Sequence, residues 1–131
     1  MQYLRNPPPE RCTLHGAFFD IAVGSADAKI RAISRRRITQ SIEIAKKLKA
    51  RAVVFHTNTI ANFHSHAYQE SWLNENAAFY SDMLRENREI DLLIENMFDD
   101  TPELLLRLSE RLSAHPNYGV CLDFAHASLS Q

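Results

Sequence analysis

The chain has 131 residues, 45% of them hydrophobic, and its 15 Lys and Arg residues nearly balance its 16 Asp and Glu residues. This length suits a single domain with a substantial core. The formal net charge of −1 argues against a general binder of nucleic acid or acidic membranes, because such proteins usually carry a basic excess. The apolar runs are far shorter than the roughly 20 residues of a transmembrane helix, so no membrane span is predicted.

The N-terminus and the cysteines indicate the compartment. The opening stretch, "MQYLRNPPPERCT", lacks the apolar core of a secretory signal peptide. Cys12 and Cys121 lie far apart in the sequence, which predicts two free, mostly buried thiols rather than a disulfide. Because free thiols are typical of a reducing compartment, we expect a cytoplasmic protein.

The first half of the chain predicts a lead-in, a strand, a long helix and a second strand. Residues 1–12 contain three consecutive prolines and read as an extended lead-in. Residues 13–23 read as a strand that runs into a loop, and residues 25–50 as a helix with Ser25 as candidate N-cap. Residues 52–58, "AVVFHTN", form a short β-branched run typical of a buried strand. The helix owes its predicted core face to apolar residues at helical spacing, namely Ile30, Ile33, Ile38, Ile42, Ala45 and Leu48.

The second half repeats the alternation. A polar loop, "TIANFHSHAYQE", precedes a helix over residues 71–87, and a short strand follows at 91–96. The next helix, over 99–115, has Asp100 or Thr101 as cap, Pro102 at its first helical position and a core stripe of leucines. The last segment, 118–126, reads as a fourth strand. The predicted core residues of these helices are Trp72, Phe79, Tyr80, Met83, Leu105, Leu108 and Leu112.

The order β-α-β-α-β-α-β predicts an α/β fold. Alternation of this kind implies about four parallel strands in sequential order, with the helices packed on the outer face. We expect these strands near residues 13–19, 52–56, 91–95 and 119–124. No glycine-rich "GxGxxG" turn follows any of them, so the sequence gives a dinucleotide-binding fold no support.

Ionisable side chains stand where three of the predicted strands end. His56 follows "AVVF", Glu95 follows "DLLI" and Asp123 follows "GVCL". His15 belongs to the first strand, and His126 comes three residues after Asp123. Because the carboxyl ends of parallel strands lie on one face of a βα array, these groups are expected to converge there, where (β/α)₈ barrels carry their active sites.

Converging carboxylates would repel one another unless a positive charge lay among them. A divalent cation supplies that charge, and imidazole together with carboxylate suits Zn²⁺ or Mn²⁺, with Mg²⁺ or Co²⁺ as further candidates. The sequence therefore predicts a metal site formed by strand-end residues. We also expect at least one of the paired carboxylates, Glu95 or Asp123, to have a raised pKa without metal.

The segments "LHGAFFDI", "VVFHTN", "LLIENMFDDTPELL" and "GVCLDFAHAS" together resemble the xylose isomerase-like TIM barrels. This superfamily includes sugar-phosphate isomerases and epimerases and the endonuclease IV type of abasic-site nuclease. The resemblance runs from about residue 13 to the end, and the "IEN" and "LDxxH" strand ends are its most specific parts. It implies that residues 13–131 form a partial TIM-barrel domain, about half of a full (β/α)₈ barrel.

The resemblance also implies roles for the strand-end residues. Glu95 and Asp123 correspond to metal ligands, and Glu95 is additionally the expected catalytic residue. In the isomerase and epimerase branch His126 contacts substrate, whereas in the multi-zinc nuclease branch His15, His56 and His126 are further ligands. The sequence leaves these alternatives open, although Thr57 and Asn58 replace the Pro-Gly usual after the histidine in the nuclease branch.

A full barrel needs eight strands, of which four are predicted. The missing part normally supplies another histidine ligand, a late glutamate ligand and general-base function. We therefore expect this chain alone to hold an incomplete site. An isolated half-barrel exposes two sheet edges and the apolar inner face, which predicts self-association into a homo-oligomer or pairing with a complementing chain.

Three functions follow from these features. The first is a divalent-metal-dependent isomerase or epimerase acting on a small-molecule sugar or sugar phosphate. The second is endonuclease IV-like, metal-dependent phosphodiester cleavage at abasic DNA, which the mild acidity and the lack of a basic stripe disfavour. The third is a truncated, non-catalytic half-barrel that serves as an assembly partner. The sequence does not decide whether this chain is an enzyme on its own.

Other noticeable residues have plainer interpretations. His64 and His66 lie in a polar loop and are expected to be solvated, and His115 before a proline is expected to be exposed. The run Arg35–Arg37 fans around a helix and is interpreted as a solvated face. Trp72, with Phe79, is expected to belong to the core rather than to a stacking platform.

Overall fold

The computed structural model describes residues 12–129, and the described residues contain four strands and four helices. The predicted lead-in therefore lies, except for Cys12, outside the described residues. The elements in chain order are β1 (Thr13–His15), α1 (Ala28–Lys47), β2 (Ala52–His56), α2 (His66–Glu86), β3 (Asp91–Glu95), α3 (Glu103–Leu112), β4 (Tyr118–Cys121) and α4 (Phe124–Leu129).

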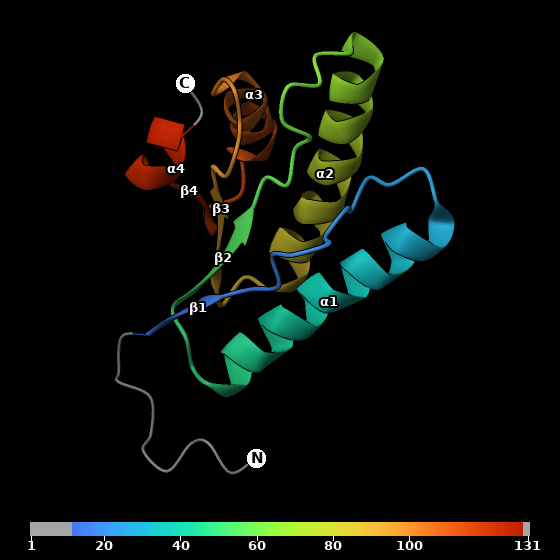
Figure 1. The fold of residues 1–131 in the computed structure, drawn as a ribbon. Coiled ribbons are helices and arrows are strands. Elements are labelled where there is room, and N and C mark those ends of the chain that lie inside the picture. The colour runs from blue at the N-terminus through green and yellow to red at the C-terminus, as the bar shows by residue number, and fades with distance from the viewer. Residues whose placement is uncertain (1–11, 130–131) are drawn as a thin grey trace.

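The four strands form one parallel sheet in the order β1-β2-β3-β4, which confirms the predicted α/β architecture. Figure 1 shows α1, α2 and α3 along one face of this sheet. The strand register places Leu14, Val53, Leu92 and Tyr118 in one row across the sheet. Because residues paired across neighbouring strands point to the same face, this row and every second row after it face the helices.

The core fills the space between the sheet and the three helices. Val53 and Phe55 of β2 are fully buried, and Leu92 and Ile94 of β3 are 1% exposed. Gly16 allows the chain after β1 to pass close to this layer, since a Cβ there would lie 2.2 Å from Phe55 Cε1. The helices contribute the predicted core residues Ile38, Ile42, Ala45, Trp72, Phe79, Tyr80, Met83, Leu105, Leu108 and Leu112.

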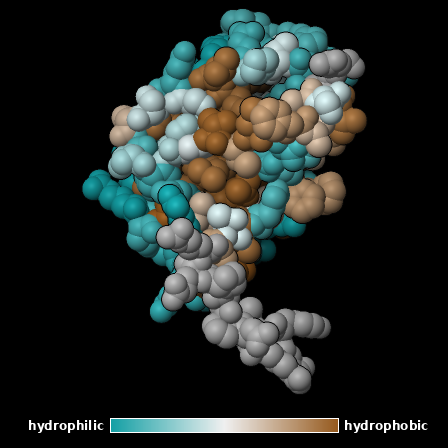
Figure 2. Space-filling model, turned by 90° about the vertical axis from the view of Figure 1, so that its left-hand side faces the viewer, coloured by the Kyte–Doolittle hydropathy of each residue, from teal (hydrophilic) through white to brown (hydrophobic). Residues whose placement is uncertain are grey.

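The opposite face of the sheet carries no covering layer in the described part of the chain. Val54 and Leu93 lie on it in adjacent strands and are only half-buried. Figure 2 shows apolar side chains gathered in a band down the face seen from the left of Figure 1. In a closed barrel this face would point inward, so the exposed band fits the partial barrel that the sequence predicts.

The start of α1 differs from its prediction. Asp27, not Ser25, is the N-cap, because its Oδ1 accepts hydrogen bonds from Lys29 N at 2.8 Å and Ile30 N at 3.2 Å. Ser25 instead caps the turn before it, accepting from Asp27 N. Ile30 and Ile33 were expected in the core but are 47% and 48% exposed, since the first turns of α1 extend past the sheet.

The other helix boundaries also shift. The helix α2 begins at His66, five residues before the predicted start, because Ser65 caps it by accepting from Tyr68 N at 3.4 Å. Pro102 occupies the cap position of α3, so the helix starts at Glu103. No helix of the described residues is both long and apolar enough to cross a membrane.

Two predicted strands are shorter than expected. β1 ends at His15 rather than near residue 19, and β4 ends at Cys121. After β4 the chain turns into α4, which the sequence did not predict. Asp123 explains the turn, because its Oδ1 accepts a hydrogen bond from His126 N at 2.9 Å, in the manner of a helix cap.

Candidate metal centre

The parallel register brings the strand-end residues together. His56 is the last residue of β2, pairs with Glu95 at the end of β3, and Glu95 pairs in turn with Cys121 of β4. His15 ends β1 and pairs with Val54, two residues before His56. These rows alternate with the core-facing ones, so the side chains point to the inner face of the sheet, at the mouth of the partial barrel.

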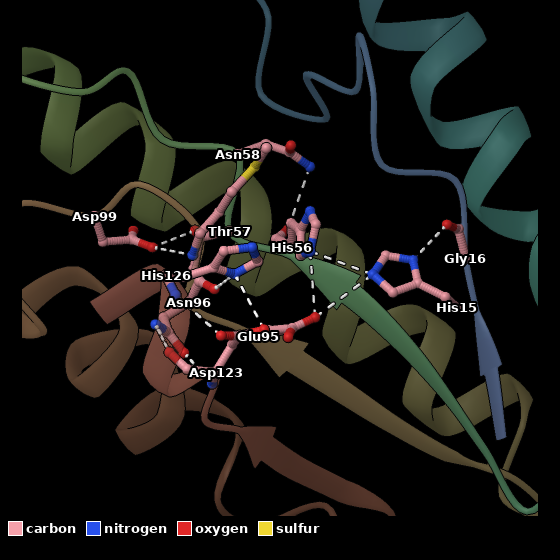
Figure 3. Close-up of polar contacts among 11 residues, drawn as sticks. His15, Gly16, His56, Thr57, Asn58, Glu95, Asn96, Asp99, Asp123 and His126 are labelled. Carbon is pink, nitrogen blue, oxygen red and sulfur yellow. Dashed lines mark hydrogen bonds and ion pairs between the residues drawn. The ribbon is translucent and has the colours of Figure 1, made fainter. Parts of the chain in front are cut away.

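A first donor group consists of His15, His56 and Glu95. The Nε2 atoms of the two histidines are 3.2 Å apart, and Glu95 Oε2 lies 3.5 Å from His15 Nε2 and 3.2 Å from His56 Nε2. Figure 3 shows the three side chains directed toward one another from three adjacent strands. A tetrahedral ion with bonds of about 2.0–2.2 Å separates its donors by roughly 3.3–3.6 Å, so the spacing of this triangle suits one ion.

A second donor group consists of Glu95, Asp123 and His126. Each of the three offers a ligand atom within 4.8 Å of the others. Glu95 therefore belongs to both groups. The sequence predicted that Glu95 and Asp123 would converge, and the geometry of the described residues agrees.

Hydrogen bonds to the histidine rings decide which nitrogen carries the lone pair. His15 Nδ1 lies 3.0 Å from the carbonyl oxygen of Gly16, and His126 Nδ1 lies 2.9 Å from that of Asn96. A carbonyl only accepts, so in both rings Nδ1 carries the proton when the imidazole is neutral and Nε2 carries the lone pair. Backbone carbonyls orient metal-binding histidines in this way in many metal sites.

The ring of His56 is the most buried of the three. Its side chain is 6% exposed, and its Nδ1 is a buried polar atom without a hydrogen-bond partner among the described residues. Burial and the neighbouring His15 lower the pKa of His56, against the opposing effect of Glu95. The ring is therefore held neutral, which is the form that binds a metal.

Of the two carboxylates for which a raised pKa was expected in at least one, Asp123 does not have it. The backbone N–H of His126 lowers the pKa of Asp123, aided by the backbone N–H of Ala125 and opposed by partial burial. Asp123 is thus ionised because the first turn of α4 solvates it, a contact that the sequence did not reveal. An ionised carboxylate is the ligand form that a divalent cation requires.

The donor set fits a divalent metal ion, with two oriented imidazole lone pairs, one neutral buried imidazole and two carboxylates around one mouth. A family model described as "Xylose isomerase-like TIM barrel" matches residues 10–131. The chain belongs to the xylose isomerase-like TIM barrel family. A comparison with curated proteins found no match.

Several solved structures share the fold of this chain. The TTHB071 protein from Thermus thermophilus, soaked with ZnCl₂, is 26% identical with a TM-score of 0.76, over 88% of this chain and 47% of its own. A D-tagatose 3-epimerase-like protein is also 26% identical, with a TM-score of 0.69, over 88% of this chain and 45% of its own. An L-ribulose 3-epimerase is 18% identical and shares the fold, with a TM-score of 0.68 over 89% of this chain and 42% of its own.

The chain spans less than half the length of these structures. Together with the exposed inner face, this agrees with a partial xylose isomerase-like barrel.

Asn96 is a residue of the site that sequence reasoning missed. Its Nδ2 donates to Asp123 O at 2.9 Å and its Oδ1 accepts from Asp123 N at 2.8 Å, so the side chain continues the β3–β4 pairing beyond the strands. Its own carbonyl fixes His126. The signal for it is the "IEN" motif, which places a polar amide directly after Glu95 at the end of a buried strand.

Asp99 and two phenylalanines were also missed. Asp99 accepts from Thr57 Oγ1 at 2.7 Å and from Thr59 Oγ1 at 2.9 Å, joining the loop after His56 to the loop after Glu95. Phe18 packs edge-on against the rings of His15 and His56, with centroids 5.2 and 5.6 Å away. Phe98 lies 5.9 Å from the ring of His126. These rings make one side of the mouth apolar.

The residues with plainer interpretations lie away from this centre. The side chains of His64 and His66 are 66% and 86% exposed, as predicted, although His66 begins α2. His115 is half-buried, not exposed, because it forms a 2.9 Å hydrogen bond with Ser81 Oγ. Arg35 does not simply face water either, since it pairs with Glu75 at 2.7 Å. The remaining expectations hold in part, with Trp72 and Phe79 buried, and Cys12 and Cys121 free but only half-buried.

Proposed function

We propose that this chain carries the metal-binding part of a divalent-metal-dependent sugar or sugar-phosphate isomerase or epimerase. The main support for this proposal is that Glu95 belongs to two donor groups at the C-terminal mouth of the sheet. Two neighbours of the family bear epimerase names, one D-tagatose 3-epimerase-like and one L-ribulose 3-epimerase. Both names refer to ketoses, which supports a small sugar as substrate.

The proposed ligands are Glu95 and Asp123, with His15, His56 and His126 as further ligands or substrate contacts. Nitrogen-rich donors favour Zn²⁺, and Mn²⁺ fits where the carboxylates dominate. When bound, such an ion would polarise a substrate carbonyl and neighbouring hydroxyl. The ionised Asp123 would balance the ion's charge, and the carbonyls of Gly16 and Asn96 keep two imidazoles oriented toward the mouth.

Glu95 is the proposed catalytic residue. Isomerisation and epimerisation of a ketose remove a proton from the carbon next to the carbonyl and return one. The Glu95 carboxylate is 9% exposed and has two oxygens, so one can face the histidines while the other accepts that proton. Phe18 and Phe98 keep water from part of this space, which strengthens the electrostatic interactions within it.

The test measures metal binding and proton exchange on the same protein. Calorimetric titration with Zn²⁺ and Mn²⁺ should show binding that a Glu95→Gln, Asp123→Asn double variant loses. The matched control is Glu86→Gln with Asp82→Asn, two exposed carboxylates of α2, which should bind as the wild type does. Equal binding by the site variant would disprove the metal centre. With metal bound and a complementing half-barrel present, a ketose in D₂O should exchange the proton next to its carbonyl, and no exchange in that complex would contradict the isomerase or epimerase activity.

The endonuclease IV-like function is a second candidate, and one observation favours it. His15 and His56 complete a donor triangle with Glu95, as expected for the multi-zinc branch. The near-neutral charge of the chain gives DNA little electrostatic attraction. Cleavage of an abasic duplex by the zinc-loaded protein, without ketose exchange, would favour this alternative.

The complete site is proposed to need further βα units. The mouth formed by four strands is open on its inner side, and a second βα half would cover the apolar band of Figure 2. A complementing chain or a second copy of this chain could provide that half. If neither supports metal-dependent activity, the third candidate, a non-catalytic half-barrel that acts in assembly, is favoured. The free cysteines agree with the proposed reducing, cytoplasmic location.

A further inference from the structure

A cavity of about 290 Å³ lies outside the metal centre, beside the N-terminal half of α2. Its walls come from the segment between β1 and α1, from the loop after β2, and from one face of α2. Tyr68, Trp72 and Asn76 form that face, since residues four apart lie on the same side of a helix. Ile21 and Val23 close the opposite side and are both buried.

The chemistry of the walls differs from that of the metal mouth. None of the residues lining the cavity carries an ionisable acidic or basic side chain such as Asp, Glu, His, Lys or Arg. An ion entering it would lose part of its hydration without gaining a partner of opposite charge, which is unfavourable. The cavity therefore selects against phosphates, carboxylates and metal ions, and favours a neutral molecule.

Several polar groups in the walls retain hydrogen-bonding capacity, among them two on α2, Tyr68 and Asn76. Asn76 is 3% exposed and donates through Nδ2 to Trp72 O at 2.8 Å, while its Oδ1 accepts no hydrogen bond from the described residues. Tyr68 Oη accepts from Ile60 N at 2.9 Å, which leaves its hydroxyl hydrogen to donate. A mainly apolar cavity with a few such groups matches a ring compound that carries few polar atoms.

The volume sets the size of that compound. An apolar cavity of about 150 Å³ in a protein interior accommodates one benzene ring. The present cavity is about twice as large, so it matches two fused rings. A sugar of similar size carries a hydroxyl on nearly every carbon, whereas Ile21, Val23 and Trp72 give these walls large apolar areas.

From these features we infer that the cavity is a second ligand site, which takes a neutral aromatic molecule of about two fused rings with a hydrogen-bond donor. Thr57 and Asn58, the residues directly after His56, form part of its wall. Thr57 is also tied to the site by its N–H, which donates to Glu95 O at 3.0 Å. A ligand in the cavity would thus lie against the loop that leaves the metal centre. The inference does not depend on the proposed function.

The experiment uses the fact that Trp72 is the only tryptophan of the chain. In a ¹⁵N-labelled full chain, its side-chain N–H gives one resonance, which unlabelled indole should shift saturably both with and without EDTA. Indole-3-acetate, which adds a carboxylate, should bind at least tenfold more weakly. D-fructose and inorganic phosphate should leave the resonance unchanged.

Two variants fill the cavity from exposed positions in its wall, Ala22→Phe and Ala26→Phe. Each should weaken indole binding at least tenfold while the remaining backbone resonances stay dispersed. Ala114→Phe, at an exposed alanine outside the cavity, is the control and should bind indole as the wild type does. No saturable shift with indole would overturn the inference. Unchanged binding by both filling variants, or equal affinity for indole-3-acetate, would overturn it as well.

A failure here would leave the metal proposal intact, because calorimetry with Zn²⁺ and Mn²⁺ reports on different residues. Conversely, loss of metal binding in the Glu95 and Asp123 variant should not change the response of Trp72 to indole.

Discussion

At the scale of single residues, backbone groups control the state of the donor side chains. Asp123 is ionised because N–H groups of α4 donate to it, and His15 and His126 are oriented by carbonyls. Glu95 differs, since its carboxylate contacts side chains at the mouth, with Oε2 3.5 Å from His15 Nε2 and 3.2 Å from His56 Nε2. Because Glu95 belongs to both donor groups, it should matter most for metal binding.

Replacing Asp123 by Asn tests the contribution of its charge. Asn keeps an oxygen that can cap α4, so the fold should persist, but the neutral amide is a poor ligand for Zn²⁺. We expect metal affinity to fall by about 100-fold or more, a ligand being worth at least as much as an outer-sphere partner. Because the folded-state pKa of Asp123 is lowered, its stabilising effect is present above about pH 3.9 and is lost as the pH falls through the folded value. Asn should remove this acid-dependent part, as measured by urea unfolding between pH 2 and 6.

The lowered pKa of His56 leads us to expect a second pH dependence of folding stability, at milder acidity. Its folded-state pKa is lowered, so the unfolded chain binds the proton more readily than the folded chain. The stability that follows from the neutral ring is complete above about pH 6.5 and decreases as the pH falls through the folded value. Urea unfolding in EDTA should therefore show a loss of stability below pH 6.5 that His56→Gln reduces. An exposed histidine variant, His66→Gln, should leave the pH profile unchanged.

At the scale of elements, the loops after β3 and β4 depend on each other. Asn96 is 9% exposed and joins them through two hydrogen bonds to the backbone of Asp123. Asp99 provides the corresponding link between the loops after β2 and β3. The donor groups are therefore held by a network that crosses three βα junctions, rather than by the strands alone.

Asn96→Ala should weaken both stability and metal binding. It leaves the backbone N–H and C=O of Asp123 without their partners, which costs about 1–3 kcal/mol where they are buried. Metal affinity should fall by about 10–100-fold through the misplaced Asp123 and His126. Asn74→Ala, at an exposed asparagine of α2 that contacts Arg111, serves as the control. If Asn96→Ala lost stability yet kept full metal affinity, Asn96 would stabilise the fold without positioning the ligands.

Elements with a strong apolar pattern could be predicted from the sequence. The strands β2 and β3 were found with their observed ends because short β-branched or aliphatic runs stop at an ionisable residue. The first turn of α2 and all of α4 were missed, because "HAYQE" is polar and "FAHASL" buries no residue. Such short segments are fixed by caps, here Ser65 and Asp123, and by contacts with distant loops.

For the candidate site, too, the strand-end residues could be predicted from the sequence and the loop contacts could not. His15, His56, Glu95, Asp123 and His126 could be brought together from parallel topology alone, since strand ends share one face. The lowered pKa of Asp123 could not be predicted, because it depends on N–H groups whose direction only the fold reveals. Asn96 and Asp99 act through the loops, where sequence periodicity gives no information.

At the scale of the whole molecule, the helices cover only one face of the sheet. A parallel sheet is normally covered on both faces. Here the inner face retains half-buried Val54 and Leu93, and both outer strands of the four-stranded sheet, β1 and β4, are edges among the described residues. Apolar area removed from water contributes about 25 cal/mol per Å², so covering this face would stabilise the chain.

The inner face should therefore drive association of the isolated chain. Leu93→Lys puts a charge in the middle of that face, next to Gly119, and should shift sedimentation toward monomer and reduce binding of a dye specific for apolar surfaces. Leu106→Lys is the matched control, because Leu106 is 59% exposed on α3, whose core residues face the other side of the sheet. It should lower dye binding only slightly and leave association unchanged. A wild-type chain that sediments as a monomer at micromolar concentration and binds no dye would contradict the prediction. If instead both lysine variants dissociated equally, the contact would not be specific to the inner face. Dissociation by Leu93→Lys alone would identify the uncovered sheet as the surface that a second half-barrel occupies.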